Sequence, residues 1–361
     1  MRWSLQVGRI AGIPLRIHAT FLLLVAWVAW VNWRHDPNPR SVGLAVLFLL
    51  AVFALVVIHE LSHALTARVF GIGTRDIVLW PIGGVSRLEE MPKEPLRELL
   101  VALAGPATNV VFALALAVWI FATRGPVIPP PDFTTDFPGA LLWANVVLAA
   151  FNLLPAFPMD GGRALRAFLA LLLDRVQATR VAAAVGRAFA VVLGLLGLFV
   201  LGSPILLLIA AFVWIGAGAE ASHAELEAGL AGRRLDQAMT HPPTVRGEDP
   251  LAVPAELLVV AGQRAFPVLI GGEVVGVLGE REILRGLREA GPNAPASRFM
   301  RQDALHAGRD EPLITAWRAL QSPDAPPCVL VEEAGRLVGV VTPAAISERM
   351  AIDAALGPRA A

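Results

Sequence analysis

The sequence is poor in cysteine and in charge. Its single cysteine, Cys328, excludes an internal disulfide and a cysteine-based zinc site, and its simplest interpretation is a buried thiol. The formal net charge is zero and the isoelectric point is near 7.1, so no basic surface indicates a nucleic-acid partner. Charged residues make up 17% of the 361 residues. Ordinary soluble domains contain roughly 25%, so most of this chain is not expected to be soluble.

Hydrophobic residues are abundant instead, and they are unevenly distributed. They make up 56% of the sequence, and the mean hydropathy is +0.62. Most of the charge lies after Glu220. We therefore expect a membrane-embedded domain at residues 1–220, followed by a domain outside the membrane.

Six apolar segments have about the length needed to cross ~30 Å of hydrocarbon as helices. The first segment contains few strictly apolar residues, and two prolines, Pro155 and Pro158, interrupt the fourth. The predicted spans are residues 17–33, 42–65, 98–122, 139–157, 181–202 and 204–220. The expected fold class is therefore a polytopic α-helical membrane protein with about six transmembrane helices.

Basic residues predict the orientation of these spans. They cluster before the first span, between the second and third, and between the fourth and fifth, whereas the opposite loops hold few. The positive-inside rule places the basic loops in the cytoplasm. We therefore expect a multi-pass protein of the cell membrane whose N-terminus and C-terminal domain are both cytoplasmic.

The most informative segment is His-Glu-Leu-Ser-His, residues 59–63, at the end of the second predicted span. No charged residue occurs at positions 41–58 before it, and polar side chains in lipid are costly unless they serve a function. Residues four apart share a helix face, so His59 and His63 can direct two imidazole nitrogens at one metal ion. Glu60 lies one step around the helix, where it can act as a base. The pattern predicts a zinc hydrolase site within the membrane.

A third ligand is expected, because a catalytic zinc ion usually has three protein ligands and a water. Asp160 lies in a polar segment, residues 152–162, at the cytoplasmic end of the fourth span and at a depth similar to that of the histidines. Two prolines prevent a regular helix there, and irregular backbone at membrane depth is tolerated where it lines a wet cavity. The other interpretation is that Asp160 is the N-cap of a helix that continues from Arg163.

These two polar clusters resemble the site-2 protease family of intramembrane zinc metalloproteases. That family combines a membrane HExxH with an Asn-x-x-Pro-x-x-Pro-x-Asp-Gly segment, and this chain has both, at residues 59–63 and 152–161. Residues 104–109 are similar to the family's Gly-Pro-x-x-Asn element, and residues 79–88 to the glycine-containing hairpin that follows its zinc helix. The resemblance covers about residues 1–220.

The resemblance implies an enzyme with one zinc ion per chain, held by His59, His63 and Asp160, in which Glu60 activates water. It also implies a membrane-spanning protein substrate in the lipid bilayer, cleaved near its cytoplasmic side in regulated intramembrane proteolysis. Further family positions near the site are expected to contact the substrate: Asn152, Asn109, Gly83 and Gly84. Asn152 can orient the scissile peptide or stabilise an oxyanion. The alternative for Asn109 is a bridge between helices.

The hairpin suggests how an unwound substrate is held. Residues 77–79 and Val85 can form strands with a free edge, to which an extended peptide adds by backbone pairing. The alternative is a plain cytoplasmic turn. His18, near the start of the first span, is expected to be a packed or hydrogen-bonding histidine and not a ligand.

A linker helix is predicted at residues 221–233, and two similar units follow at residues 234–290 and 291–361. Each unit has an amphipathic helix, an apolar strand, a turn, and a second strand that ends before another helix. This duplication resembles a tandem pair of α/β CBS domains. The resemblance implies an adenine-nucleotide ligand and a homodimer formed through the pair, with Glu282 and Thr342 at the nucleotide positions.

The nucleotide motif of the CBS pair is incomplete. CBS units that bind ribose typically carry Thr or Ser, two further residues and then Asp after the second strand. The first unit has Gly279 and Glu282 there, and the second has Thr342 and Ala345. A regulatory or dimerising module without a ligand is therefore the alternative.

Two rival functions for the whole chain are a CBS-gated transporter or channel, and an inactive nucleotide-sensing membrane scaffold. Zinc-dependent proteolysis would distinguish the enzyme from these two rival functions.

Overall fold

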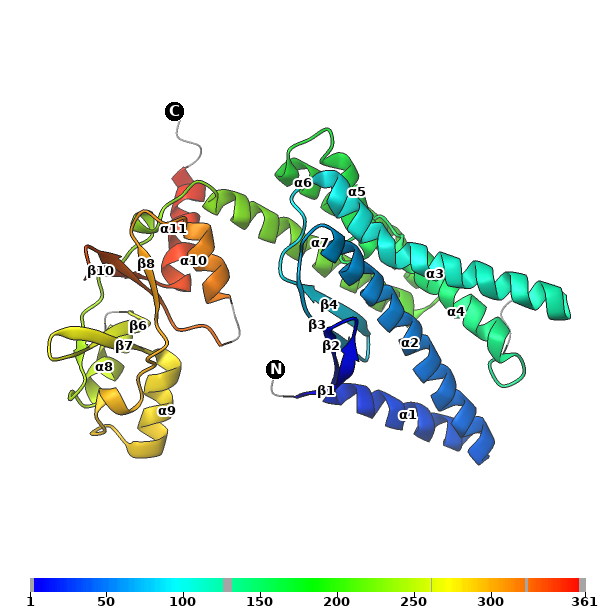
Figure 1. Cartoon of the computed structure of the whole chain (residues 1–361), viewed down its shortest axis with the longest axis horizontal. Coiled ribbons are helices and arrows are strands. Elements are labelled where there is room, and N and C mark those ends of the chain that lie inside the picture. The colour runs from blue at the N-terminus through cyan, green and yellow to red at the C-terminus, as the bar shows by residue number, and fades with distance from the viewer. Residues whose placement is uncertain (1–2, 126–131, 261, 322–323, 357–361) are drawn as a thin grey trace. The chain divides into compact units, whose positions relative to one another are not determined.

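The computed structural model describes residues 3–125, 132–260, 262–321 and 324–356 (Figure 1). The chain divides into two compact units, Met1–Ala224 and Glu225–Ala361. The boundary lies inside one long helix, α7 (Pro204–Leu230), which includes most of the predicted linker helix. The last five residues of the second predicted CBS domain lie outside the described part of the chain.

A four-stranded sheet in the order β1-β2-β3-β4 belongs to the first unit. Its strands are β1 (Ser4–Ile10), β2 (Ile13–His18), β3 (Thr74–Trp80) and β4 (Gly83–Leu88). The β1–β2 hairpin turns at Ala11 and Gly12, which both have positive φ, as a tight hairpin turn requires. β2 pairs parallel with β3, and β3 pairs antiparallel with β4. The predicted hairpin after the histidine-bearing helix therefore exists, and its pairing with an N-terminal hairpin was not predicted.

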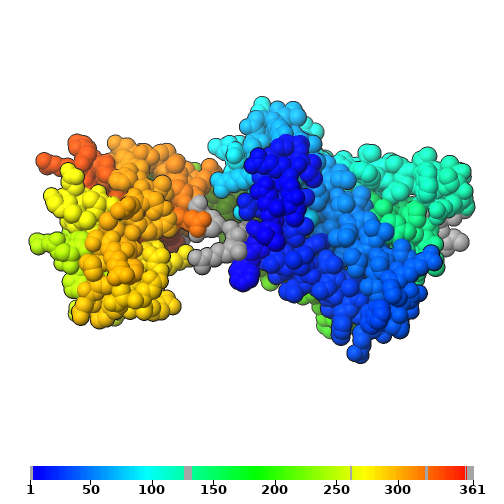
Figure 2. Space-filling model, turned by 60° about the horizontal axis from the view of Figure 1, so that its bottom comes forward, coloured from blue at the N-terminus to red at the C-terminus, as the bar shows by residue number. Residues whose placement is uncertain are grey.

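The two edge strands of this sheet differ in their surroundings. β1 is exposed along most of its length, and its residues lie on the surface of the first unit, in dark blue in Figure 2. β4 packs against helix α2 (Pro39–Val69), which carries the histidine motif. An edge strand has unpaired backbone groups, so β4 brings such groups to the candidate site.

A helix corresponds to each of the six predicted spans. They are α1 (Ala19–His35), α2, α3 (Pro95–Arg124), α4 (Phe137–Asn152), α6 (Arg175–Leu195) with a π-helical end (Leu196–Val200), and α7. Within the described residues, α2, α3, α6 with its π-helical end, and α7 are long and apolar enough to cross a membrane, whereas α1 and α4 have 17 and 16 residues. Only 22–33% of the residues in the four spanning windows are buried, so most apolar side chains face outward, as they do in lipid.

The fourth predicted span ends earlier than expected, because α4 stops at Asn152 and the chain becomes irregular as far as Met159. The short helix α5 (Asp160–Leu169) follows directly. Its first residues pack tightly on the irregular segment. A Cβ atom on Gly161 would lie 2.2 Å from the carbonyl oxygen of Leu154, and one on Gly162 would lie 2.5 Å from the amide nitrogen of Phe157. The two glycines therefore allow α5 to begin where it does.

A buried ion-pair cluster ties α5 to three other helices. The guanidinium of Arg166 on α5 donates to Glu98 on α3, with Nε 2.8 Å and Nη2 2.5 Å from Oε1. Arg166 also contacts Glu220 on α7, and Arg175 on α6 lies 3.3 Å from the second oxygen of Glu98. Arg166 and Glu98 are 5% and 1% exposed. Buried charges of this kind are stable only when paired, so the cluster fixes α5 relative to α3.

The second unit contains two similar halves, each with a three-stranded sheet. The first half has β5 (Val245–Arg246), α8 (Ala252–Val260), β6 (Ala265–Ile270), β7 (Glu273–Gly279) and α9 (Glu280–Ala290). The second has β8 (Leu305–Gly308), α10 (Leu313–Leu320), β9 (Val329–Glu333), β10 (Arg336–Val341) and α11 (Pro343–Leu356). A shared core around Cys328 includes Val277 of one half and Val340 of the other. The predicted strand–turn–strand–helix duplication is therefore present.

Candidate functional site

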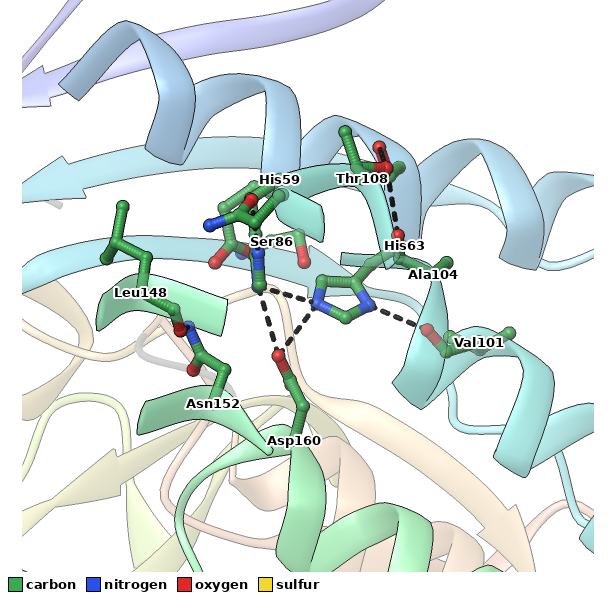
Figure 3. Close-up of polar contacts among 12 residues, drawn as sticks. His59, His63, Ser86, Val101, Ala104, Thr108, Leu148, Asn152 and Asp160 are labelled. Atoms are coloured by element: carbon green, nitrogen blue, oxygen red, sulfur yellow. Dashed lines mark hydrogen bonds and ion pairs between the residues drawn. The ribbon is translucent and has the colours of Figure 1, made fainter. Parts of the chain in front are cut away.

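Three side-chain atoms from α2 and α5 converge at one point in the first unit. The Nε2 atoms of His59 and His63 lie 3.0 and 3.1 Å from Oδ2 of Asp160, and 3.1 Å from each other. All three residues are at most 9% exposed. Figure 3 shows Asp160 pointing from α5 toward the two histidines on α2. The helix N-cap is Met159, and Asp160 is the first helical residue, with its carboxylate turned to the histidines.

Helix α3 determines which nitrogen of each histidine carries the proton. Nδ1 of His63 lies 2.7 Å from the carbonyl oxygen of Val101, and Nδ1 of His59 lies 3.2 Å from Oδ1 of Asn109. A carbonyl oxygen can only accept, so each Nδ1–H donates and each neutral ring keeps its lone pair on Nε2. This is the arrangement by which protein groups outside the coordination sphere orient metal-binding histidines.

The three converging atoms are suited to a metal cation. With Nδ1 protonated in each neutral ring, both Nε2 atoms and the carboxylate oxygen direct lone pairs at one point, where a cation can accept all three. A tetrahedral zinc ion with bonds of about 2.0–2.1 Å separates its ligands by about 3.3 Å, slightly more than the distances found here. Among the described residues, His59, His63 and Asp160 form the one group that could hold a metal ion in this way.

Gly105 on α3 supplies the space for the two imidazole rings. A Cβ atom at this position would lie 2.3 Å from Nε2 of His63 and 2.5 Å from Nε2 of His59. Gly105 belongs with Glu98, Val101 and Asn109 to a single stripe of α3, because spacings of three and four residues share a helix face. Sequence reasoning identified Asn109 and missed the other three as site residues. The signal that could have identified them is the regular spacing of small and polar residues along an otherwise apolar helix.

Glu60 lies beside the three-atom cluster and is held by strand β4. Its Oε2 accepts a hydrogen bond from the backbone N–H of Ser86 at 2.9 Å. Gly84 packs against the same side chain, because a Cβ atom there would lie 2.7 Å from Cγ of Glu60. The structure therefore places the predicted base next to the predicted ligands and against the edge strand.

A cavity of about 540 Å³ joins these groups, a volume typical of ligand-binding sites. Its lining includes the predicted ligands and base, together with Gly83, Gly84, Ser86, Asn109 and Asn152. Asn152 donates from Nδ2 to the carbonyl oxygen of Leu148 at 3.0 Å, which leaves its Oδ1 available to another donor. All the site residues predicted for the first unit therefore border one cavity.

His18 has a local role in the described structure. Its Nδ1 accepts from the backbone N–H of Thr20 at 3.3 Å and so caps the start of α1, and its ring stacks on Trp80 at a centroid distance of 3.9 Å. It does not belong to the cavity lining. The expectation of a packed histidine agrees with this position.

The two predicted nucleotide positions both lie at the start of the helix that follows the second strand of their half, but they are not equivalent: Glu282 is the third residue of α9, and Thr342 immediately precedes α11. Glu282 accepts from the backbone N–H of Gly279 at 3.2 Å, at the start of α9. Thr342 accepts from the backbone N–H of Ala345 at 3.1 Å, at the start of α11. Both side chains therefore cap the helix that follows the second strand of their half.

Both parts of the chain are similar to known proteins. The model of Peptidase family M50 matches residues 47–137 and 132–196, and the CBS domain model matches residues 235–289 and 296–351. A zinc metalloprotease of Methanocaldococcus jannaschii is 29% identical, over 98% of this chain and 97% of its own length. Rip3 of Mycobacterium tuberculosis is 31% identical, over 96% and 93% of the two chains. The solved site-2 protease from Methanocaldococcus jannaschii is 32% identical and covers 61% of this chain and 95% of its own, with a TM-score of 0.45.

Proposed function

The chain belongs to peptidase family M50, the site-2 proteases, and on this premise we propose that His59, His63 and Asp160 bind its zinc ion and that Glu60 is its catalytic base. The protein is thus a membrane zinc metalloprotease with a CBS pair. The observation that carries the assignment of ligands is the convergence of three lone-pair atoms within 3.0–3.1 Å of one another. Zinc-dependent proteolysis is the outcome that separates this function from a transporter and from an inactive scaffold.

The residues around the cavity suit peptide hydrolysis. A bound zinc ion lowers the pKa of water and polarises the substrate carbonyl. The Glu60 carboxylate accepts a proton from the attacking water and passes it to the leaving amine nitrogen, as a C–O bond forms and the C–N bond breaks. Asn109 keeps His59 in the correct tautomer, and Asn152 orients the scissile peptide or stabilises the developing oxyanion.

We infer that the substrate is a membrane-spanning protein segment that unwinds and pairs with the edge of β4. A peptide bond in a helix has its carbonyl oxygen engaged in a hydrogen bond, so it must become extended before it can be attacked. β4 is an edge strand, and its Gly84 and Ser86 contact the Glu60 side chain. Pairing at this edge would bring an extended peptide to the base. We place this chemistry near the cytoplasmic side of the membrane and in regulated intramembrane proteolysis.

Two variants of the full-length protein in lipid vesicles test the catalytic assignment. Glu60→Gln is expected to retain zinc and to lose cleavage of a membrane-spanning substrate. Asp160→Ala is expected to lose both, because one of the three ligand atoms is removed. Cleavage by Glu60→Gln would remove Glu60 from the role of base, and full zinc content in Asp160→Ala would remove Asp160 from the ligands.

Substrate pairing is tested by a proline in the strand. Val85 lies opposite Val78 in the β3–β4 ladder, so Val85→Pro disrupts the strand without touching a proposed ligand. The expected result is loss of cleavage with unchanged zinc content. Normal cleavage by this variant would exclude β4 as the substrate strand.

For the second unit we propose a cytoplasmic regulatory role, through an adenine nucleotide or through dimerisation. The support is the family membership of both halves and the hydrogen bonds by which Glu282 and Thr342 cap the starts of α9 and α11. Calorimetry of the full-length protein with ATP, ADP and AMP measures ligand binding, and sedimentation measures the oligomeric state. A monomer without nucleotide affinity would contradict the proposal.

A further inference from the structure

The backbone of the substrate-pairing strand itself holds the catalytic base. β4 pairs with β3 on one side only, and in this ladder Ser86 lies opposite Ile77 and Val85 opposite Val78. Backbone groups alternate along a strand, so the N–H and C=O of every second residue point to the same side. The Ser86 N–H donates to Glu60 and is therefore not used in the ladder with β3. It lies on the open side of the edge strand.

The Glu60 carboxylate thus occupies a position that an added strand would need. In backbone pairing at the open side of β4, the Ser86 N–H would donate to a carbonyl oxygen of the incoming peptide. That carbonyl oxygen and Oε2 of Glu60 are both acceptors, and only one can take a full hydrogen bond from a single N–H at about 2.9 Å. Two acceptors at one donor also repel each other.

We propose that the Ser86 N–H is a substrate-displaced latch on Glu60. Without substrate, the hydrogen bond holds the carboxylate against β4. An extended peptide takes over the Ser86 N–H and releases Glu60, which then accepts its proton from the attacking water. This inference rests on the proposed function, because it requires Glu60 as base and β4 as the docking edge. It adds that the base becomes available only when a peptide has paired.

The latch makes the enzyme selective for peptides that form a strand. A helical segment uses its carbonyl groups internally and has none to offer Ser86, so Glu60 stays bound to β4. A very short peptide pairs too weakly to displace the carboxylate. An unwound transmembrane segment supplies the carbonyl oxygen that displaces Glu60 from Ser86, and it also carries the peptide bond that is then cleaved. The Ser86 amide therefore contacts the substrate and also determines which substrates are cleaved.

Removing the N–H alone tests the latch. Replacing the residue-86 amide by an ester in the full-length enzyme removes the donor and retains the shape of the strand. The same replacement at Val7, on the opposite edge strand β1, is the matched control. Ser86→Pro is the second variant, since an outward-facing N–H at a sheet edge is a position where proline is tolerated. Zinc content and the kinetics of two substrates are measured, a short unstructured peptide and a membrane-spanning protein.

The latch predicts opposite effects on the two substrates. Hydrolysis of the short peptide should rise about tenfold, the equivalent of one hydrogen bond to a charged acceptor. The membrane-spanning substrate should show a KM higher by about the same factor and no loss of kcat, because it has lost one backbone bond to β4. The Val7 ester should resemble the unmodified enzyme for both substrates.

Two results would overturn the latch. If the residue-86 ester and Ser86→Pro lower short-peptide hydrolysis, the amide holds the base in a productive position. If neither differs from the Val7 ester, the hydrogen bond has no influence on catalysis. Failure of the underlying function gives a different pattern. In that case Glu60→Gln still cleaves, or Val85→Pro cleaves the membrane-spanning substrate normally, whatever the effect at residue 86.

Discussion

Gly105 on α3 and His63 on α2 are so close that a Cβ atom on Gly105 would lie 2.3 Å from Nε2 of His63. A shift of the imidazole away from such a methyl group would disturb the 2.7 Å hydrogen bond from Nδ1 to the carbonyl oxygen of Val101. The glycine therefore permits the histidines to face Asp160. The size of this one side chain decides whether the three ligand atoms meet.

Replacing Gly105 by alanine should weaken zinc binding about 10–100-fold, since the methyl group displaces both Nε2 atoms. The measurement is the zinc affinity of the purified protein in a competition titration. Gly43→Ala on α2 is the control, because nothing lies within 4 Å of a Cβ atom there. Equal affinities in the two variants would contradict the role assigned to Gly105.

Arg166→Gln should destabilise the membrane unit by up to about 3–5 kcal/mol, because the buried Glu98 loses both hydrogen bonds from Arg166 and keeps only the 3.3 Å contact with Arg175. Zinc affinity should fall as well, since Asp160 and Arg166 belong to the same short helix. Arg124→Gln serves for comparison. Arg124 pairs with Asp136 at an exposed position, and its loss should cost less than about 1 kcal/mol. Unfolding in detergent with and without zinc measures both effects, and similar losses in the two variants would be inconsistent with a buried cluster.

Gly84→Ala should reduce cleavage roughly 100-fold while zinc remains bound. The added methyl group meets Cγ of Glu60 at 2.7 Å and Cγ1 of Val56 at 2.9 Å, so it displaces the base without touching a proposed ligand. Gly8→Ala, on β1, introduces a methyl group with nothing within 4 Å. Rates and zinc content of both variants are to be compared with the parent enzyme. Loss of zinc in Gly84→Ala would show that the hairpin supports the ligands and not the base.

Burial raises the pKa of the Cys328 thiol to about 12, because the charged thiolate is desolvated in the core shared by the two halves of the second unit. The thiol should therefore stay unlabelled by maleimide at pH 8 until the unit unfolds. A cysteine introduced at the exposed Val259 should react at once. The raised pKa contributes stability that is fully present below pH ~9 and is lost as the pH rises toward 12. Rapid labelling of native Cys328, followed by mass spectrometry, would contradict this burial.

Much of the site could be predicted from local sequence. The spacing of His59 and His63 on an apolar helix is a property of the helix itself. The prolines and glycines around Asp160 act locally as well, since they end α4 and allow α5 to begin. The β3–β4 hairpin was predicted from its own residues, whereas its extension by β1 and β2 depends on pairing between residues 62 positions apart, such as Leu15 and Ile77.

The number of helices that cross the membrane does not follow from composition alone. All six apolar segments are helical, yet α1 and α4, with 17 and 16 residues, do not reach the length of the other four. The histidine that precedes α1 ends a strand and caps a helix. An apolar segment of this length is compatible with either a short span or a helix at the membrane boundary, and only its neighbours distinguish them.

The sequence by itself determined the helices, the pair of imidazoles and the duplicated second unit, because each depends on residues that are near neighbours along the chain. The tertiary structure brought Asp160, already expected from the sequence, to the histidines, and it alone decided which carbonyl fixes each tautomer and that Ser86 holds Glu60. These contacts join residues from 26 to 101 positions apart. They arise from the packing of α2, α3, α5 and β4, where close contact at glycines and the pairing of buried charges bring these groups together.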